Sequence, residues 1–223
     1  MGRLPRGGRL SSVLRVTEIF RSIQGESTRA GFPCAFIRLT GCALRCVWCD
    51  SAYAFHGGAA MTVDEAARKV LELETDLVEV TGGEPLEQDA VHDLIGRLLD
   101  AGKTVLLETG GHVSIDRVDP RVVKIVDVKA PGSGMEHANL AENLDRLSDR
   151  DELKFVLADR RDFDWALEFV SRRGLDRRNT VTFSPVWDSL PAAELAAWIR
   201  DSGRPIRLGL QLHKLLWGEV PGR

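Results

Sequence analysis

A chain of 223 residues, of which 43% are hydrophobic and 28% charged, is long enough to bury one sizeable core and has the composition of a globular protein. Its formal net charge of -3 at pH 7 gives no electrostatic reason to expect a nucleic-acid partner. No segment approaches the roughly 20 apolar residues that a membrane-spanning helix requires, so we expect a cytoplasmic protein without a membrane partner.

Residues 1–14 are expected to form a flexible N-terminal tail, because arginine and glycine are frequent there and no apolar run of secretory length follows. An organelle presequence is the second interpretation of this segment. No internal repeat or low-complexity linker divides the rest of the chain, so residues 15–223 are expected to form a single domain.

Short apolar runs alternate with amphipathic stretches along this domain. The apolar runs predict strands at 34–40, 77–82, 104–110, 124–129, 152–158, 180–186 and 206–212. Amphipathic stretches predict helices at 62–74, 88–102, 159–174 and 191–203. Thr62 and Glu65 form a capping box at the start of the first helix, and Gly102 and Gly174 are typical residues at helix ends.

The repeated order of strand, helix and strand predicts an α/β fold with parallel strands and right-handed crossovers. About six such units fall short of a closed eightfold barrel, so we predict a modified, partial and open TIM-like barrel. Ligands of parallel α/β folds bind beyond the C-terminal ends of the strands. Polar motifs follow these ends here: TGC, TGGEP, ETGGH, DVKAPGSG, SPVWD and QLHK.

The segment GCALRCVWCDS, residues 41–51, contains three of the four cysteines: Cys42, Cys46 and Cys49. In a reducing compartment such a cluster favours metal binding or catalysis over disulfides. Structural zinc sites commonly have four ligands, and His56 is the candidate for a fourth, because Cys34 is interpreted as a buried strand residue. An iron–sulfur cluster held by three cysteines instead leaves one iron open for a ligand with an amine and a carboxylate. The residues alone leave both interpretations open.

Other strand ends also carry two interpretations. Gly82 and Gly83 let the backbone approach a ligand closely, although an ordinary strand-to-helix turn has the same residues. Glu108 suits a ribose diol or a polar substrate edge, or else pairs with a buried basic residue. Lys129 can bind a carboxylate or remain partly solvated. The polar residues at 24–26 are interpreted, from their chemistry alone, as a surface turn.

The spacing C-x3-C-x2-C with Trp48 before the last cysteine, followed by TGGEP, resembles the radical S-adenosylmethionine (SAM) superfamily. With EIF..IQGE, G.P..FIRL.GC, CDS, ETGG, ELKFV and QLHK, the chain is similar to the 7-carboxy-7-deazaguanine synthase family from about residue 18 to residue 217. The resemblance implies a carbon–nitrogen lyase that converts 6-carboxy-5,6,7,8-tetrahydropterin to 7-carboxy-7-deazaguanine with loss of ammonia. That reaction belongs to 7-deazapurine (queuosine and archaeosine) biosynthesis.

Two alternatives remain at this point: a radical SAM activase of a glycyl-radical enzyme, and a non-catalytic iron–sulfur or zinc protein. For the synthase, the resemblance implies a 4Fe-4S cluster, S-adenosylmethionine and Mg²⁺ as cofactors. It further implies a small-molecule pterin substrate, an electron donor such as flavodoxin or ferredoxin, and a homodimer.

The resemblance also assigns roles to individual residues. The cluster ligands are Cys42, Cys46 and Cys49, and the Mg²⁺ ligand is Ser51, where the family usually has threonine. The substrate-binding residues are Ile23, Gln24, Gly25, Glu26, Arg38, Thr81 and His213. The cofactor-binding residues are Gly82, Gly83, Glu84, Glu108, Asp127, Val128, Lys129, Ser184, Pro185, Val186 and Trp187.

Overall fold

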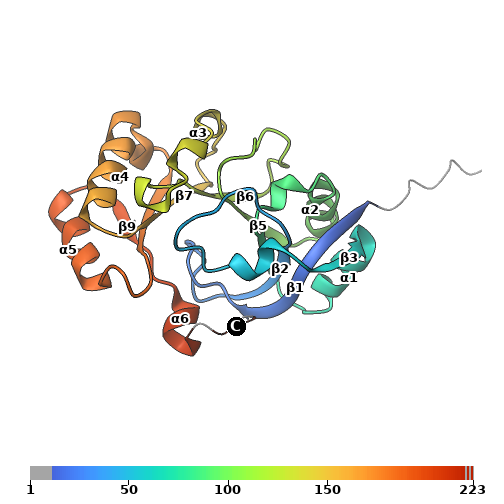
Figure 1. Ribbon diagram of the computed structural model, residues 1–223. Helices are drawn as coiled ribbons and strands as arrows, with labels where there is room; N and C mark the ends of the chain where they lie inside the picture. The colour runs from blue at the N-terminus through green and yellow to red at the C-terminus, as the bar shows by residue number, and fades with distance from the viewer. Residues whose placement is uncertain (1–11, 219, 221, 223) are drawn as a thin grey trace, which may run out of the picture.

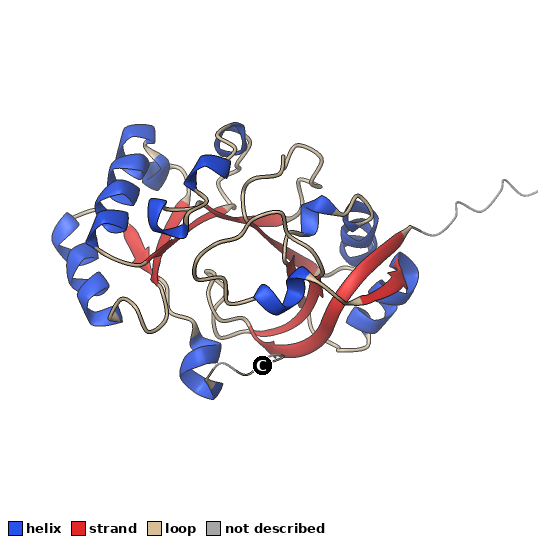
Figure 2. Ribbon diagram, in the orientation of Figure 1, coloured by secondary structure: helices blue, strands red, loops and turns tan. Residues whose placement is uncertain are grey.

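The computed structural model describes residues 12–218, 220 and 222, which form one strongly curved sheet with helices on its outer face (Figures 1 and 2). The spatial order of the strands is β3-β1-β2-β4-β5-β6-β7-β8-β9. The strands are β1 (Val13–Ile23), β2 (Pro33–Leu39), β3 (Ala59–Thr62), β4 (Leu77–Gly82), β5 (Thr104–Thr109), β6 (Val123–Asp127), β7 (Glu152–Leu157), β8 (Thr180–Pro185) and β9 (Ile206–Leu208).

From β2 to β9 all neighbouring strands pair in parallel, and the sheet does not close. This arrangement confirms the predicted open, partial barrel. The prediction missed β1, which pairs antiparallel with β2 and with β3 and so widens the sheet at its N-terminal edge. It also missed β3, which has four residues and no clear alternation of apolar and polar side chains.

The helices are α1 (Val63–Leu71), α2 (Val91–Asp100), α3 (Glu142–Asp145), α4 (Arg160–Arg173), α5 (Ala192–Ser202) and α6 (Leu212–Trp217). The predicted capping residue is confirmed, because the Thr62 hydroxyl accepts a hydrogen bond from the Glu65 amide at 3.1 Å. Helix α4 ends at Gly174, whose φ of 59° is the left-handed conformation that glycine adopts without a steric penalty. None of the described helices is long and apolar enough to cross a membrane.

Alternate residues of each strand point to opposite faces of the sheet. On the outer face, Val80, Leu107 and neighbouring residues pack against α1 and α2, and Phe155, Phe163 and Phe183 form the core near α4 and α5. Burying each such large side chain stabilises the fold by about 1.5–3 kcal/mol. On the inner face, an apolar floor contains Cys34, Phe36, Leu77, Leu106 and Ile125. The free thiol of Cys34 is fully buried there, as expected, and its burial raises its pKa.

Two predicted boundaries need correction. Val13 and Leu14 were assigned to the tail, but they begin β1, and Leu14 is fully buried. Residues 1–11 of that predicted tail lie outside the described part of the chain. The strand predicted at 206–212 ends at Leu208, because Gly209 leaves the strand and α6 begins at Leu212.

Candidate active site

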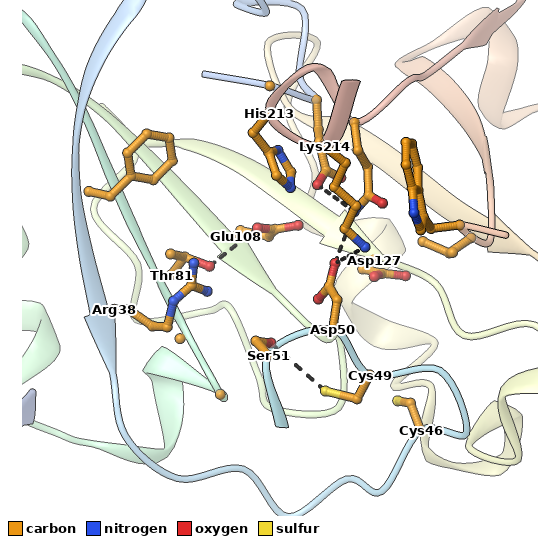
Figure 3. A pocket seen from close by; sticks show the side chains of 18 of the residues that line it. Arg38, Cys46, Cys49, Asp50, Ser51, Thr81, Glu108, Asp127, His213 and Lys214 are labelled. Atoms are coloured by element: carbon orange, nitrogen blue, oxygen red, sulfur yellow. Dashed lines mark hydrogen bonds and ion pairs between the residues drawn. The ribbon is translucent and has the colours of Figure 1, made fainter. Parts of the chain in front are cut away.

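A cavity of about 490 Å³ opens at the C-terminal ends of the parallel strands (Figure 3). It brings together most of the residues that the family resemblance had assigned: Ile23, Gln24, Gly25, Glu26, Arg38, Cys42, Cys46, Cys49, Ser51, Thr81, Gly82, Gly83, Glu108, Asp127, Lys129, Pro185, Val186, Trp187 and His213. Three assigned residues are buried and are not part of its lining: Glu84, Val128 and Ser184.

The cysteine loop packs directly on the end of β4. The Gly83 amide donates to the Leu39 carbonyl at 3.1 Å, and the Glu84 amide donates to the Gly41 carbonyl at 2.7 Å. A Cβ atom on Gly83 would lie only 1.9 Å from the Gly41 oxygen. Position 83 therefore requires glycine, because any side chain would push the cysteine loop away from the strand end.

The spacing of the thiols argues against a single zinc ion. Within the described residues, the one set of three or more potential ligand atoms within 4.8 Å of one another comprises Cys42, Glu87 and His112. Thiolates that share a tetrahedral zinc lie roughly 3.8 Å apart, since each Zn–S bond is about 2.3 Å. His56, the expected fourth zinc ligand, is exposed and outside this set. Three thiols spread around one loop instead suit the separate irons of a cluster.

The His112 side chain was not predicted to have a role. Its Nε2 atom lies 2.9 Å from Glu87 Oε1, and that oxygen also accepts from the Ala43 amide at 2.8 Å. The Nδ1 atom of His112 is buried and has no hydrogen-bond partner among the described residues. The pair thus supports the cysteine loop from the side of β5, and the histidine that directly follows ETGG was its sequence signal.

Glu84 holds the end of β5 instead of facing the cavity. Its carboxylate accepts from the amides of Leu86 at 3.0 Å and Gly110 at 2.8 Å, and from the Thr109 hydroxyl at 2.9 Å. The side chain is fully buried. The carboxylate thus fixes the two Gly-Gly strand ends next to each other, and the cofactor-binding role assigned to Glu84 stays a prediction.

A buried ion-pair network lies at the bottom of the cavity. Lys154 Nζ lies 2.6 Å from Glu26 Oε2 and 2.7 Å from Glu108 Oε1. The Thr81 hydroxyl donates to Glu108 Oε2 at 3.2 Å (Figure 3). Burial alone would lower the pKa of Lys154, but the two carboxylates hold this pKa well above its usual value. Lys154 therefore remains charged. Of the two interpretations of Glu108, the structure supports pairing with a buried basic residue.

Lys154 itself was not predicted to be a site residue. The available signal was a lysine in the middle of the otherwise apolar strand ELKFVLA. A charged residue at an inward position of a buried strand needs a charged partner, but its partners come from the segment after β1 and from β5. Pairing across such distances in sequence is not visible before the fold is known.

Arg38 lies near the C-terminal end of β2, with its guanidinium group in the cavity (Figure 3). Its Nε atom donates to Glu18 Oε1 at 2.7 Å, and the Tyr53 hydroxyl donates to the same oxygen at 2.8 Å. An ion pair with an acid of the chain and a contact with a substrate carboxylate are therefore compatible roles for this arginine. Glu18 fixes the side chain, while the two Nη atoms have no hydrogen bond to a described residue and form the fork that suits a carboxylate.

On the opposite wall, Lys129 Nζ pairs with Asp127 Oδ2 at 2.9 Å. The second carboxylate oxygen, Oδ1, is buried and has no hydrogen-bond partner among the described residues. An unpaired buried acceptor costs free energy, so this oxygen suits a ligand that brings a hydroxyl or amine donor. Pro185, Val186 and Trp187 line the same wall and offer an apolar surface.

Helix α6 connects the segment at 24–26 to the cysteine loop. The Gln211 amide group donates to Glu26 Oε1 at 3.0 Å and to Asp50 Oδ2 at 2.9 Å. Lys214 Nζ lies 3.5 Å from the same Asp50 oxygen (Figure 3). The His213 ring covers Gly25, where a Cβ atom would lie 2.7 Å from Nδ1. Ser51 Oγ lies 3.8 Å from the sulfur of Cys49.

Comparison with known proteins agrees with the resemblance seen in the sequence. Residues 36–128 match the family model described as the radical SAM superfamily. The chain is 45% identical to a 7-carboxy-7-deazaguanine synthase of Chlorobaculum tepidum, over 92% of this chain and 94% of the relative. It is 44% identical to a synthase of the same name from Koribacter versatilis, over 92% of this chain and 97% of the relative.

Among solved structures, the crystal structure of QueE from Escherichia coli is similar to this fold, with a TM-score of 0.72. The match covers 89% of this chain and 94% of the other chain at 23% identity. At that identity the likeness concerns the fold, and it includes the open arrangement of the sheet.

Proposed function

The chain belongs to the 7-carboxy-7-deazaguanine synthase family of radical SAM enzymes, and we propose that its cavity converts 6-carboxy-5,6,7,8-tetrahydropterin to 7-carboxy-7-deazaguanine and ammonia. The observation that carries the proposal is the single cavity in which the three-cysteine loop faces Arg38 and the Glu26–Lys154–Glu108 network. The names of the relatives disfavour a glycyl-radical activase, and the thiol spacing disfavours a structural zinc protein.

The residues present fit the cofactors of this family. Cys42, Cys46 and Cys49 would hold the 4Fe-4S cluster. Their loop packs closely against β4 because Gly83 has no side chain. S-adenosylmethionine would lie between this loop and the wall that contains Asp127. When bound, the two groups supply a 5'-deoxyadenosyl radical that takes a hydrogen from the substrate.

The remaining polar groups of the cavity suit a pterin. Such a substrate is flat and has a guanidine-like donor edge and a carboxylate. Glu26, which pairs with Lys154, and the backbone near Gly25 would accept hydrogen bonds from the donor edge. The two Nη atoms of Arg38 would bind the carboxylate in a bidentate manner. The ring of His213 would cover the bound substrate from the side of α6.

A Mg²⁺ ion would bind at Ser51 together with the substrate carboxylate. Mg²⁺ prefers hard oxygen ligands and keeps several of its waters, so a serine hydroxyl is chemically able to replace the threonine that is usual in the family. Replacing Ser51 with alanine should remove the stimulation of product formation by Mg²⁺, whereas Ser51→Thr should retain it.

We further propose a cytoplasmic homodimer that receives electrons from a flavodoxin or a ferredoxin. Val47, in the middle of the cysteine loop, has 76% of its surface exposed, which supports direct approach of a donor protein to this loop.

Anaerobic reconstitution tests the function. Protein loaded with iron and sulfide, then mixed with reductant, S-adenosylmethionine, Mg²⁺ and the carboxytetrahydropterin, should release ammonia and a deazaguanine acid in equal amounts. Single Cys→Ala variants at positions 42, 46 and 49 serve as controls that should lose both products. Release of ammonia that does not depend on these cysteines would sink the proposal.

A further inference from the structure

Gln24 lines the cavity, but most of the hydrogen-bonding capacity of its side chain is used within the protein. Its Oε1 atom accepts hydrogen bonds from the amides of Glu26 and Ser27, both at 2.9 Å. Its Nε2 atom donates to Glu79 Oε2 at 2.9 Å. Only 3% of Gln24 is exposed, so these residues are not the surface turn that their chemistry alone had suggested. Three of the four hydrogen-bonding positions of the amide are thus occupied by the chain itself.

The acceptor of that bond, Glu79, is an ionisable residue in an apolar setting. It lies in β4, next to Phe36 of β2 and Leu106 of β5 in the sheet register, and 3% of it is exposed. Burial and then the neighbouring Glu108 carboxylate raise its pKa to about 8. A buried carboxyl group at such a position is costly unless it is hydrogen-bonded, and Gln24 provides that bond.

These contacts form a closed ring around the bottom of the cavity. From Glu79 the ring passes through the Gln24 amide to Glu26, and the Glu26 carboxylate pairs with Lys154. Lys154 pairs with Glu108, and Glu108 accepts from Thr81, which lies on β4 two residues from Glu79. A ring that begins and ends on β4 holds the segment at 24–27 at a fixed height above the apolar floor.

We propose that Glu79 is a positioning residue of the substrate site, which acts by holding Gln24 and through it the Glu26 carboxylate. The proposal rests on the proposed function only in assigning Glu26 to the substrate. Glu79 needs to accept one hydrogen bond in this role and does not need its charge. Glu79→Gln keeps an acceptor oxygen of the same shape, whereas Glu79→Met keeps the volume and removes the acceptor.

The first test measures the dissociation constant of the carboxytetrahydropterin with anaerobic, reconstituted enzyme and S-adenosylmethionine, without reductant. Loss of a buried hydrogen bond should weaken binding by about tenfold in E79M, and E79Q should stay within about threefold of the wild type at pH 7. The iron content and the urea unfolding midpoint of E79Q serve as controls for intact protein.

A double-mutant cycle separates an action through Gln24 from a direct contact with the substrate. If Glu79 acts through Gln24, the double variant E79M/Q24M should bind the pterin as weakly as Q24M alone. The proposal would be overturned if the double variant bound the pterin more weakly than Q24M, by the product of the two single effects. It would also be overturned if E79M bound the pterin as tightly as the wild type, or if E79Q bound it as weakly as E79M.

Hydrogen exchange of residues 24–32, measured without substrate, tests the positioning role of Glu79 independently of the proposed reaction. The Glu26 and Ser27 amides, which Gln24 holds, should exchange faster in E79M than in the wild type, and at the wild-type rate in E79Q. Unchanged exchange in E79M would refute the positioning role even if the pterin is converted. Faster exchange, with a wild-type enzyme that does not convert the pterin, would leave the positioning role standing and reject only the proposed reaction.

Discussion

At the scale of the single residue, Glu79 makes the stability of the fold depend on pH. Its pKa in the folded protein is raised from 4.5 to about 8 by burial and by Glu108, so the folded state binds a proton that the unfolded state has already lost. The stability linked to this group is fully present below pH 4.5 and is lost as the pH rises towards 8. The total loss is on the order of a few kcal/mol.

Replacing this carboxyl group with an amide should remove this loss of stability at rising pH. We expect the urea unfolding midpoint of Glu79→Gln, relative to the wild type, to rise steadily between pH 5.5 and pH 8, because the amide does not ionise. If the difference in unfolding midpoint between the two proteins stayed constant over this pH range, Glu79 would be ionised throughout it.

Gly83 provides a second prediction at this scale. Because a Cβ atom there would lie 1.9 Å from the Gly41 oxygen, Gly83→Ala should displace the cysteine loop and reduce the iron bound after reconstitution several-fold. Gly96→Ala is the matched control, since a Cβ atom in the middle of α2 meets no atom within 4 Å. The control should load iron normally and gain about 0.5–1 kcal/mol of stability from helix propensity. Normal iron loading in Gly83→Ala would disprove the assigned role of the strand end.

At this scale, the sequence predicted those residues whose role depends on a motif of neighbouring residues. The glycines of TGGEP and the three cysteines were assigned from their own motifs, and the structure brings them together at one cavity. Glu79, Lys154 and His112 were missed because their partners lie on other strands and loops. The contacts of the Glu84 carboxylate with Thr109 and Gly110 of the next strand end were missed for the same reason.

At the scale of the elements, the loop between β1 and β2 is tied to the distant strand β7. The Thr28 amide and hydroxyl both donate to the buried Glu152 carboxylate, the hydroxyl at 2.5 Å. This contact lies at the far end of the segment that Gln24 and Glu79 hold at its start. The two carboxylates thus hold the irregular loop at its start, where Gln24 and Ser27 are buried, and at Thr28, which is itself exposed.

Thr28→Val keeps the shape of the side chain and removes the hydroxyl donor. We expect it to lower the free energy of unfolding by about 1–3 kcal/mol, because the buried Glu152 carboxylate then accepts a hydrogen bond only from the amide of residue 28. Thr104→Val, at the exposed start of β5, is the control and should change stability by less than about 0.5 kcal/mol. Equal effects of the two substitutions in urea unfolding would contradict this account of the loop.

The elements themselves were largely predictable. The apolar runs of β2 and of β4 to β8, and the capping residues of α1 and α4, carry strong local patterns, and their positions agree closely with the prediction. The strand β1 was missed because its second half alternates weakly, with side chains of intermediate exposure at most positions from Thr17 to Ile23. The polar residues 24–26, which directly follow β1, had been interpreted from their chemistry alone as a surface turn.

At the scale of the whole molecule, the sheet stays open, and residues of the 24–26 segment and of α6 line the cavity at its strand ends. Parallel strands direct their C-terminal ends to one side, which is why motifs scattered from residue 38 to residue 187 could be expected at one site. The contacts of α6 with Glu26 and Asp50 could not be expected, because they depend on how the chain returns across the cavity after β9.

The central proposal is that this one cavity binds both S-adenosylmethionine and the carboxytetrahydropterin, and that S-adenosylmethionine would act there as a reusable cofactor and not as a consumed substrate. The most direct test is the ratio of 7-carboxy-7-deazaguanine formed to S-adenosylmethionine consumed by the anaerobic, reduced enzyme. We predict many molecules of product for each molecule of S-adenosylmethionine consumed. Accumulation of 5'-deoxyadenosine without any deazapurine would contradict the claim.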